Sequence, residues 1–269
     1  MTAMSTTYKD AAGIEGMRVA GKLASEVLDY LTPFVKPGIT TNEIDRLAHD
    51  YMTQVQKTIP ATLGYQPHGY GAYPKSLCTS VNHQVCHGIP NDKPLKKGDS
   101  LNIDITVIKD GWHGDTSRMY VAGEASTKAK LLMDVTYDAM MKGIAAIRPG
   151  ATLGDIGHAI QVHVEKHRFS VVRDFCGHGI GRHFHEPPNV LHFGRPGEGP
   201  KLKPGMFFTV EPMVNAGRPE VKILDDGWTA VTRDRSLSAQ FEHMVAVTDT
   251  GVEIFTLSPA GMHKPPYGA

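Results

Sequence analysis

The sequence has few cysteines and no long hydrophobic run. Cys78, Cys86 and Cys176 are widely spaced among 269 residues, which suits a reducing compartment better than a disulfide framework. No apolar stretch approaches the ~18 residues that a membrane-spanning helix needs. The first ten residues lack the apolar region of a signal peptide. We therefore expect a cytoplasmic protein without a membrane segment.

The sequence also lacks an excess of charge of either sign. Lys and Arg together number 28, as do Asp and Glu, so the formal net charge is zero. General electrostatic attraction to nucleic acid or to anionic membranes is therefore not expected. The length suits one large domain with a sizeable core. Nothing in the sequence indicates self-association, so we expect a monomer.

The two halves of the chain share a helical pattern. One helix is predicted near residues 14–31 and another near residues 128–147, and each is followed by a basic residue, Pro and Gly. A threonine cap with an acid three residues later then begins a second helix, at Thr40 and Glu43 in one half and at Thr152 and Asp155 in the other. The alternative is that Pro-Gly helix ends recur by chance.

A second shared pattern concerns strands that carry an acid. Gly98 precedes the strand with Asp104, and Gly205 precedes the strand that ends at Glu211. In both cases the acid lies six residues after the glycine. Two α-α-β-β units predict an α+β fold with a curved, mainly antiparallel sheet, helices on its outer face and a site where the halves meet.

These patterns predict one catalytic domain between two short extensions. We expect an N-terminal extension over residues 1–13 and a single domain over residues 14–257. Its two similar halves span about residues 14–121 and 122–257. Residues 258–269 form a Pro- and Gly-rich tail that we expect to be extended or frayed.

Several acids stand in contexts where an ionised side chain is costly. Asp104 interrupts the apolar run 101–107, Glu211 ends the run 206–210, and Glu242 lies within the run 241–247. Buried carboxylates are rarely left ionised and unpaired, so cations or protons must neutralise them. Together with Asp115 they make four carboxylates, whose charge balances two divalent cations. The sequence thus favours a dinuclear metal site.

The Asp110–Gly111 pair predicts a tight hairpin that fixes the placement of two of these acids. In that register Thr106 faces Asp115 and Asp104 faces Ser117. Asp104 and Asp115 then become diagonal neighbours on one face, within reach of ions ~3.5–4 Å apart. The alternatives are that Asp115 only caps a turn, or that a bulge shifts the register.

A segment rich in histidine and glycine supplies a nitrogen ligand. His178, His183 and His185 fall within eight residues, and Gly177 and Gly179 flank His178. Glycines allow the backbone to bend tightly and bring the imidazole close to other groups. Carboxylates with one imidazole suit Mn²⁺, Fe²⁺, Co²⁺ or Zn²⁺ rather than a cysteine-type structural zinc site. A pair of such ions supports hydrolytic chemistry.

These five residues, together with the segments 86–90 and 177–181, resemble type I methionine aminopeptidase, from about Ile14 to Leu257. The resemblance implies the duplicated pita-bread fold. It also implies removal of the initiator methionine from peptides and nascent chains at the ribosome when the second residue is small. Asp104 would hold one metal, His178 and Glu211 the other, and Asp115 and Glu242 would bridge them. Glu211 would also move a proton.

The same resemblance assigns residues to the substrate. His87 and His185 would contact the substrate without holding metal. A pocket for the methionine side chain would be formed by aromatic residues and a cysteine, whose rings and sulfur suit a thioether: Tyr70, Tyr73, Cys78, Phe184 and Trp228. The chain lacks a zinc-finger extension before the catalytic region and a long insertion between the second-half ligands. Pro67 and Met244 depart from the family pattern, and Met244 is a candidate for altering metal preference.

Three other functions remain open at this point. A metal-free peptide-binding module on the same fold would be expected to lose ligands. A proline-specific aminopeptidase P or prolidase usually carries an additional N-terminal domain. A cysteine hydrolase would use Cys86 or Cys176 with a histidine, but neighbours such as Cys86 and His87 point to opposite faces of a strand.

Overall fold

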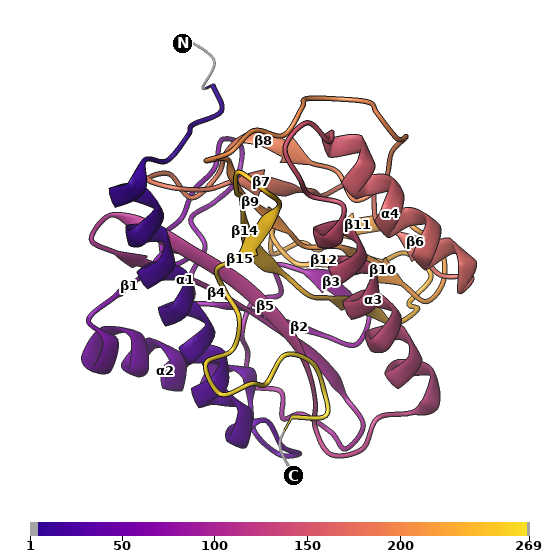
Figure 1. Ribbon diagram of the computed structural model, residues 1–269. Helices are drawn as coiled ribbons and strands as arrows, with labels where there is room; N and C mark the ends of the chain where they lie inside the picture. Colours follow the sequence, from indigo (N-terminus) through magenta and orange to yellow (C-terminus); the bar gives the residue numbers. More distant parts are fainter. Residues whose placement is uncertain (1–4, 268–269) are drawn as a thin grey trace.

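The computed structural model describes residues 5–267, in which two helix pairs flank a group of β-sheets (Figure 1). The first half contributes one pair and the second half the other. A 3₁₀ turn, η1, follows the first helix, and a π-helical turn, η2, extends the second. The helices are α1 (Ala11–Leu31), η1 (Thr32–Phe34), α2 (Thr41–Asp50), η2 (Tyr51–Gln56), α3 (Thr127–Ala145) and α4 (Leu153–Lys166).

Side-chain caps fix where the helices begin. Thr40 and Thr152 each accept a hydrogen bond from the backbone N–H three residues on, and the acid there bonds back to the threonine N–H. Both predicted capping boxes are therefore present, and they explain why α2 and α4 begin where they do. Helix α1 begins at Ala11, a few residues before the expected start, because Asp10 caps it by accepting from the N–H of Gly13 at 2.8 Å.

Every strand pairing in the described part of the chain is antiparallel, in agreement with the predicted α+β class. The strands form four small sheets with the orders β1-β4-β2 (with β5 on β4), β13-β10-β6, β11-β12-β3 and β15-β14-β9-β7-β8. Their bounds are β1 (Ile59–Pro60), β2 (Cys78–Val81), β3 (Gln84–Cys86), β4 (Ser100–Lys109), β5 (Trp112–Val121), β6 (Ser170–Val171), β7 (Gly177–Gly179), β8 (Glu186–Val190), β9 (Phe207–Val210), β10 (Met213–Asn215), β11 (Val221–Ile223), β12 (Ala230–Thr232), β13 (Ser238–Gln240), β14 (His243–Val247) and β15 (Val252–Ile254).

The β4–β5 hairpin has the predicted register. Thr106 is paired with Asp115 and Asp104 with Ser117. The turn lies at Asp110–Gly111, and both residues have positive φ, as a tight hairpin turn requires. No bulge separates the two acids, so their side chains emerge on the same face of the sheet.

Matching hydrogen bonds confirm the duplication. In the first half the N–H of Gly38 donates to the carbonyl of Leu95 at 2.8 Å. In the second half the N–H of Gly150 donates to the carbonyl of Leu202 at 3.0 Å. Both glycines have positive φ, which a side chain would strain. Each half therefore ties the end of its first helix to the turn before its acid-bearing strand in the same way.

Each half has a main core of its own, a smaller buried cluster spans the two, and the halves meet where acid-bearing strands touch. One buried cluster lies under α1 and α2, and another under α3 and α4. Between the halves, the N–H of Glu242 donates to the carbonyl of Ser117 at 3.1 Å, and the Thr116 hydroxyl donates to the carbonyl of Glu242 at 2.7 Å. Glu242 lies just before β14 rather than inside a strand, and this bridge brings it to the Asp104–Asp115 face.

The C-terminal tail is packed over its described residues, so the expectation of a frayed tail is wrong up to residue 267. It runs between α1 and α3 (Figure 1), where the Ser258 hydroxyl donates to Asp29 at 2.7 Å and Tyr267 lies against Tyr120. The domain limits proposed from the sequence remain a prediction. Part of the expected N-terminal extension, residues 1–4, lies outside the described residues, as do residues 268–269. Within the described range no helix is long and apolar enough to cross a membrane.

Candidate active site

Residues from both halves of the chain line one small cavity at the junction. It contains all five predicted metal ligands, both predicted substrate histidines and four of the five residues predicted for the methionine pocket. The lining residues are Thr62, Tyr73, Cys78, His87, Asp104, Thr106, Asp115, His178, Phe184, His185, Glu211, Trp228 and Glu242. The structure therefore brings together side chains that are widely separated in the sequence.

Within this cavity the ligand atoms of three buried residues converge. One ligand atom from each of Asp115, His178 and Glu242 lies within 4.8 Å of the others. The Nε2 atom of His178 lies 3.5 Å from Oδ2 of Asp115 and 3.6 Å from Oε1 of Glu211. Both distances are too long for a good hydrogen bond. They are suitable for ligand atoms that bind the same cations.

The orientation of His178 fits the role of a metal ligand. Its Nδ1 lies 3.1 Å from the carbonyl of Gly179, where it donates a hydrogen bond and leaves Nε2 to face the acids. Such a bond to the far nitrogen is the usual way in which a ligating histidine is oriented. The flanking glycine is required, because a Cβ on Gly179 would lie 2.2 Å from the carbonyl of Pro187.

Polar residues that the sequence did not single out orient the carboxylates. Thr106 donates to Oδ1 of Asp115 at 2.8 Å, and Thr209 donates to Oε1 of Glu211 at 2.6 Å. Gln240 donates to the second oxygen of Glu211 at 3.3 Å. Thr106 could have been found by its place opposite Asp115 in the hairpin. Gln240 gave no local signal.

The carboxylates repel one another strongly in the absence of cations. Burial, followed by the neighbouring acids, raises the pKa of Asp104 and of Glu242 well above their ordinary values, and burial raises that of Glu211 to about 7. Burial lowers the pKa of His178, but the adjacent carboxylates of Asp115 and Glu211 outweigh this, and the pKa is raised. Over residues 5–267 no lysine or arginine pairs with these acids. Divalent cations would supply the positive charge that balances these carboxylates. The four carboxylates and one imidazole are therefore suitable ligands for metal ions.

The two remaining histidines are poised as neutral groups. Burial lowers the pKa of His87 to about 4 and that of His185 to about 2. The ring of His185 lies 4.0 Å from the ring of His178, and its Nδ1 lies 2.7 Å from the Tyr65 hydroxyl. A neutral imidazole both donates and accepts hydrogen bonds, which suits contact with a peptide bond.

An aromatic cluster adjoins the acids. Tyr73, Cys78 and Trp228 are buried together, with the Tyr73 ring 5.1 Å from Trp228 in an edge-on arrangement. Phe184 lies 4.8 Å from Tyr65, which the sequence did not indicate. Tyr70 does not line the cavity; it is 41% exposed and packs on the outer side of Trp228. A sulfur atom among aromatic edges makes a favourable environment for a thioether.

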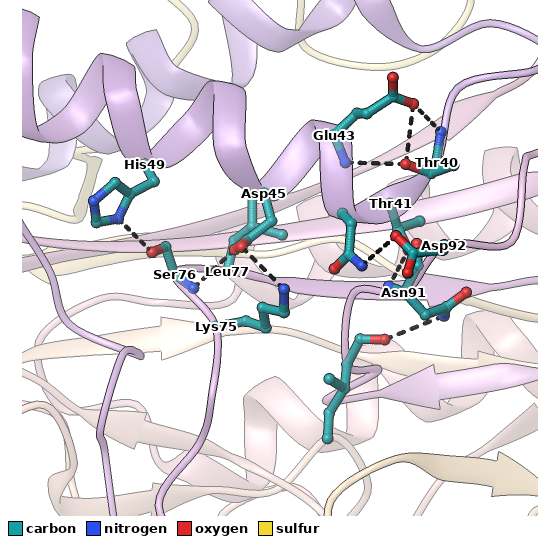
Figure 2. A network of polar contacts seen from close by, with 12 residues as sticks. Thr40, Thr41, Glu43, Asp45, His49, Lys75, Ser76, Leu77, Asn91 and Asp92 are labelled. Atoms are coloured by element: carbon teal, nitrogen blue, oxygen red, sulfur yellow. Dashed lines mark hydrogen bonds and ion pairs between the residues drawn. The ribbon is translucent and has the colours of Figure 1, made fainter.

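The wall of this pocket is anchored by helix α2 (Figure 2). Asp45 accepts from the N–H of Ser76 at 2.8 Å and lies 3.7 Å from Nζ of Lys75. One turn later, Nδ1 of His49 lies 2.8 Å from the Ser76 hydroxyl. The anchored segment immediately precedes Cys78, so α2 fixes one side of the cavity.

Met244, Cys86 and Cys176 do not line the cavity. Met244 is buried in a core cluster with Met17 and Phe255, under α1. Its side chain therefore packs in the core and does not contact the acids of the site. Burial raises the pKa of the Cys86 thiol well above its ordinary value and also raises that of Cys176. Protonated thiols are poor nucleophiles, which disfavours a cysteine hydrolase.

Comparison with known proteins agrees with this geometry. Residues 15–249 match the family model described as Metallopeptidase family M24, and the chain belongs to that family. A methionine aminopeptidase from Rickettsia prowazekii (strain Madrid E) is 61% identical over 252 residues, which cover 93% of this chain and 95% of the relative. One from Escherichia coli (strain K12) is 53% identical over 94% of this chain and 95% of the relative. Within the M24 family the chain therefore belongs with the methionine aminopeptidases.

Solved structures agree as well. The crystal structure of methionine aminopeptidase from Rickettsia prowazekii superposes with a TM-score of 0.91 at 58% identity, covering 94% of this chain and all of that one. The duplicated pita-bread fold implied by the sequence is confirmed. A metal-free binding module and a proline-specific enzyme are correspondingly disfavoured.

Proposed function

We propose that this enzyme removes the N-terminal methionine from peptides and nascent proteins whose second residue is small. One observation supports this most strongly: four carboxylates, of which Asp115 and Glu242 are buried, and His178 line one cavity with aromatic rings and Cys78. The acids provide a hydrolytic centre, and the adjoining pocket selects a thioether side chain. Membership among the methionine aminopeptidases gives the same substrate class.

We propose that two divalent ions, of Co, Mn, Fe or Zn, bind in the cavity. Asp104 would hold one ion, His178 and Glu211 would hold the other, and Asp115 and Glu242 would contribute to both. When bound, such ions lower the pKa of water and polarise a carbonyl. The bonds from Thr106 and Thr209 keep the carboxylates of Asp115 and Glu211 in place for this task.

The protein groups around the ions then bind the substrate and move the proton. Glu211 takes a proton from the attacking water and delivers it to the leaving amine. His185 donates a hydrogen bond to the carbonyl oxygen as charge develops there. His87 contacts the scissile amide. Tyr73, Cys78, Phe184 and Trp228 enclose the methionine side chain, with Tyr70 at the outer edge.

We further propose that the enzyme works as a monomer in the cytoplasm, on chains emerging from the ribosome. The support is the substrate itself, because an initiator methionine is first accessible on a nascent chain. The balanced charge of the sequence, with 28 basic and 28 acidic residues, gives no indication of direct nucleic-acid binding.

Release of methionine from three peptides tests the proposal. Met-Ala-Ser and Met-Thr-Ser should be cleaved, whereas Met-Lys-Ser should resist because its second residue meets the crowded mouth of the site. Norleucine at the first position should be tolerated, since a methylene-sized change in an apolar pocket is worth only ~1–3 kcal/mol. Rapid cleavage of Met-Lys-Ser would contradict the size rule.

Two further arms separate the alternatives. A chelator should abolish cleavage of Met-Ala-Ser, and added Co²⁺ or Mn²⁺ should restore it. An X-Pro dipeptide should not be cleaved; preference for it over Met-Ala-Ser would indicate a proline-specific enzyme. Activity that survives the chelator but is lost on thiol alkylation would indicate a cysteine hydrolase.

A further inference from the structure

The segment before helix α1 reaches the loop that carries His185. Residues 180–185 connect β7 to β8, so this loop begins just after His178 and ends at His185. The ammonium of Lys9 lies 2.6 Å from Oε1 of Glu186, the residue after His185. The Thr7 hydroxyl donates to the same carboxylate oxygen. The backbone N–H of Lys9 donates to the carbonyl of Gly205 at 2.9 Å, which fixes the segment beside β9.

Like the Arg118–Asp29 pair, whose side chains are 2% and 12% exposed, the Lys9–Glu186 pair is buried. Its two side chains are only 5% and 3% exposed, whereas those of the surface pair Lys22–Glu26 are 64% and 28% exposed. A surface pair contributes little to stability, but loss of one partner of a buried pair leaves an uncompensated charge. Glu186 therefore depends on Lys9 for its place in the structure.

The pair lies directly on the backbone of the histidine loop. Glu186 is paired with Gly179 in the β7–β8 ladder, so it closes the base of the loop. A Cβ on Gly181 would lie 2.5 Å from Nζ of Lys9 and 3.3 Å from Oε1 of Glu186. Only glycine leaves room for the lysine to pass here. Lys9 thus crosses the loop at Gly181, which lies between His178 and His185 in the sequence.

Other contacts hold the opposite side of the loop. The carbonyl of Gly181 accepts from the N–H of His113 at 3.0 Å, and the Arg182 guanidinium lies 3.9 Å over the ring of Trp112. Phe184 is stacked on His113, with ring centroids 5.8 Å apart. These anchors come from β5 and hold Phe184. The end of the loop at His185 has two supports: its backbone is held through Glu186, and its ring by the Tyr65 hydroxyl, which lies 2.7 Å from Nδ1.

We propose that Lys9 is a positioning residue: by pairing with Glu186 across Gly181, it holds the imidazole of His185 in place beside His178. The proposal rests on the role given above to His185 in the reaction. Lys9 touches neither substrate nor metal in this scheme. Its loss should slow the chemical step while the methionine pocket and the metal ligands stay in place.

The Lys9→Met variant of the full-length, metal-loaded enzyme tests this. We expect kcat for Met-Ala-Ser to fall about tenfold to a hundredfold, because small misplacements of a catalytic group have effects of this size. KM should change by less than about threefold, since uniform substrate binding is retained. Metal content should equal that of the wild type, and amide hydrogen exchange should rise in residues 180–185 alone. Lys22→Met is the matched control and should behave as wild type.

Gly181→Ala provides a second variant in case Lys9→Met does not fold. Its backbone φ is not in the left-handed region, so the added methyl group should displace only the lysine ammonium and give the same pattern. Normal kcat in a metal-replete, folded Lys9→Met enzyme, or exchange raised across the whole chain, would overturn the proposal. If the wild type released no methionine, the proposed function would fail. The exchange experiment would still test whether the Lys9–Glu186 pair holds residues 180–185 in place.

Discussion

The hydroxyl oxygen of Tyr65 lies 2.7 Å from Nδ1 of His185. Burial, followed by the nearby His178 and His87, lowers the pKa of His185 to about 2, so its ring is neutral at physiological pH. When Tyr65 donates to Nδ1, the single ring proton resides on Nε2. The pair thereby sets His185 as a hydrogen-bond donor toward the cavity.

This relationship predicts the effect of Tyr65→Phe. The ring remains, but the tautomer of His185 is no longer fixed, so kcat should fall by roughly tenfold. His185→Ala removes the donor itself and should cost ~10²–10³ in kcat. Steady-state release of methionine from Met-Ala-Ser measures both effects. Metal content should stay normal in both variants; loss of metal in His185→Ala would show that this residue is a ligand.

Removal of one carboxylate should remove metal and activity together. In Asp104→Ala and Asp115→Ala the remaining acids cannot balance two divalent cations, so both metal content and methionine release should fall to background. Elemental analysis of purified protein alongside the peptide assay measures this. Asp249→Ala, at an exposed position, is the control. Full activity in metal-free Asp104→Ala protein would refute the assignment.

Metal-free enzyme should lose stability as the pH rises from 7 to 8. Burial, followed by the neighbouring acids, raises the pKa of Asp104 and of Glu242 well above the ordinary carboxyl value, so the native protein binds protons that the unfolded chain has already lost. Proton release then favours unfolding. Bound cations reverse the effect, because they require ionised carboxylates.

Thermal unfolding of chelator-treated and metal-loaded enzyme at these two pH values checks the sign. Below pH ~6.5 the buried neutral histidines have the opposite effect, because they make the native protein more stable as the pH rises. The comparison is therefore made at pH 7 and above. Asp104→Asn should flatten the slope of the metal-free protein. A metal-free enzyme that becomes more stable between pH 7 and 8 would contradict the prediction.

Asp45→Ala should weaken methionine binding more than it slows turnover. Without the carboxylate, the N–H of Ser76 loses its partner and the segment before Cys78 is released (Figure 2). We expect KM for Met-Ala-Ser to rise about fivefold with kcat changed by less than about twofold. Asp92→Ala, which removes a surface bond to Asn42 in the same network, should leave KM unchanged.

Local sequence patterns predicted the acid-bearing hairpin correctly. The turn at Asp110–Gly111 defined which residues of β4 and β5 face each other, and the observed pairing of Thr106 with Asp115 is the predicted one. The capping boxes of Thr40 and Thr152 were also predicted correctly, because a capping box depends on two residues only three positions apart. The packing of the C-terminal tail was not predicted, because its contacts with Asp29 involve a helix far away in the sequence.

The sequence by itself thus determined the elements, the hairpin register and the acids that needed cations, because each depends on neighbouring residues or on the cost of burying charge. Only the tertiary structure decided which distant side chains support the site. Tyr65 meets His185 across 120 residues, and Lys9 meets Glu186 across 177. Such contacts depend on how loops distant in the sequence pack against one another. No periodicity or residue spacing in the chain predicts that packing.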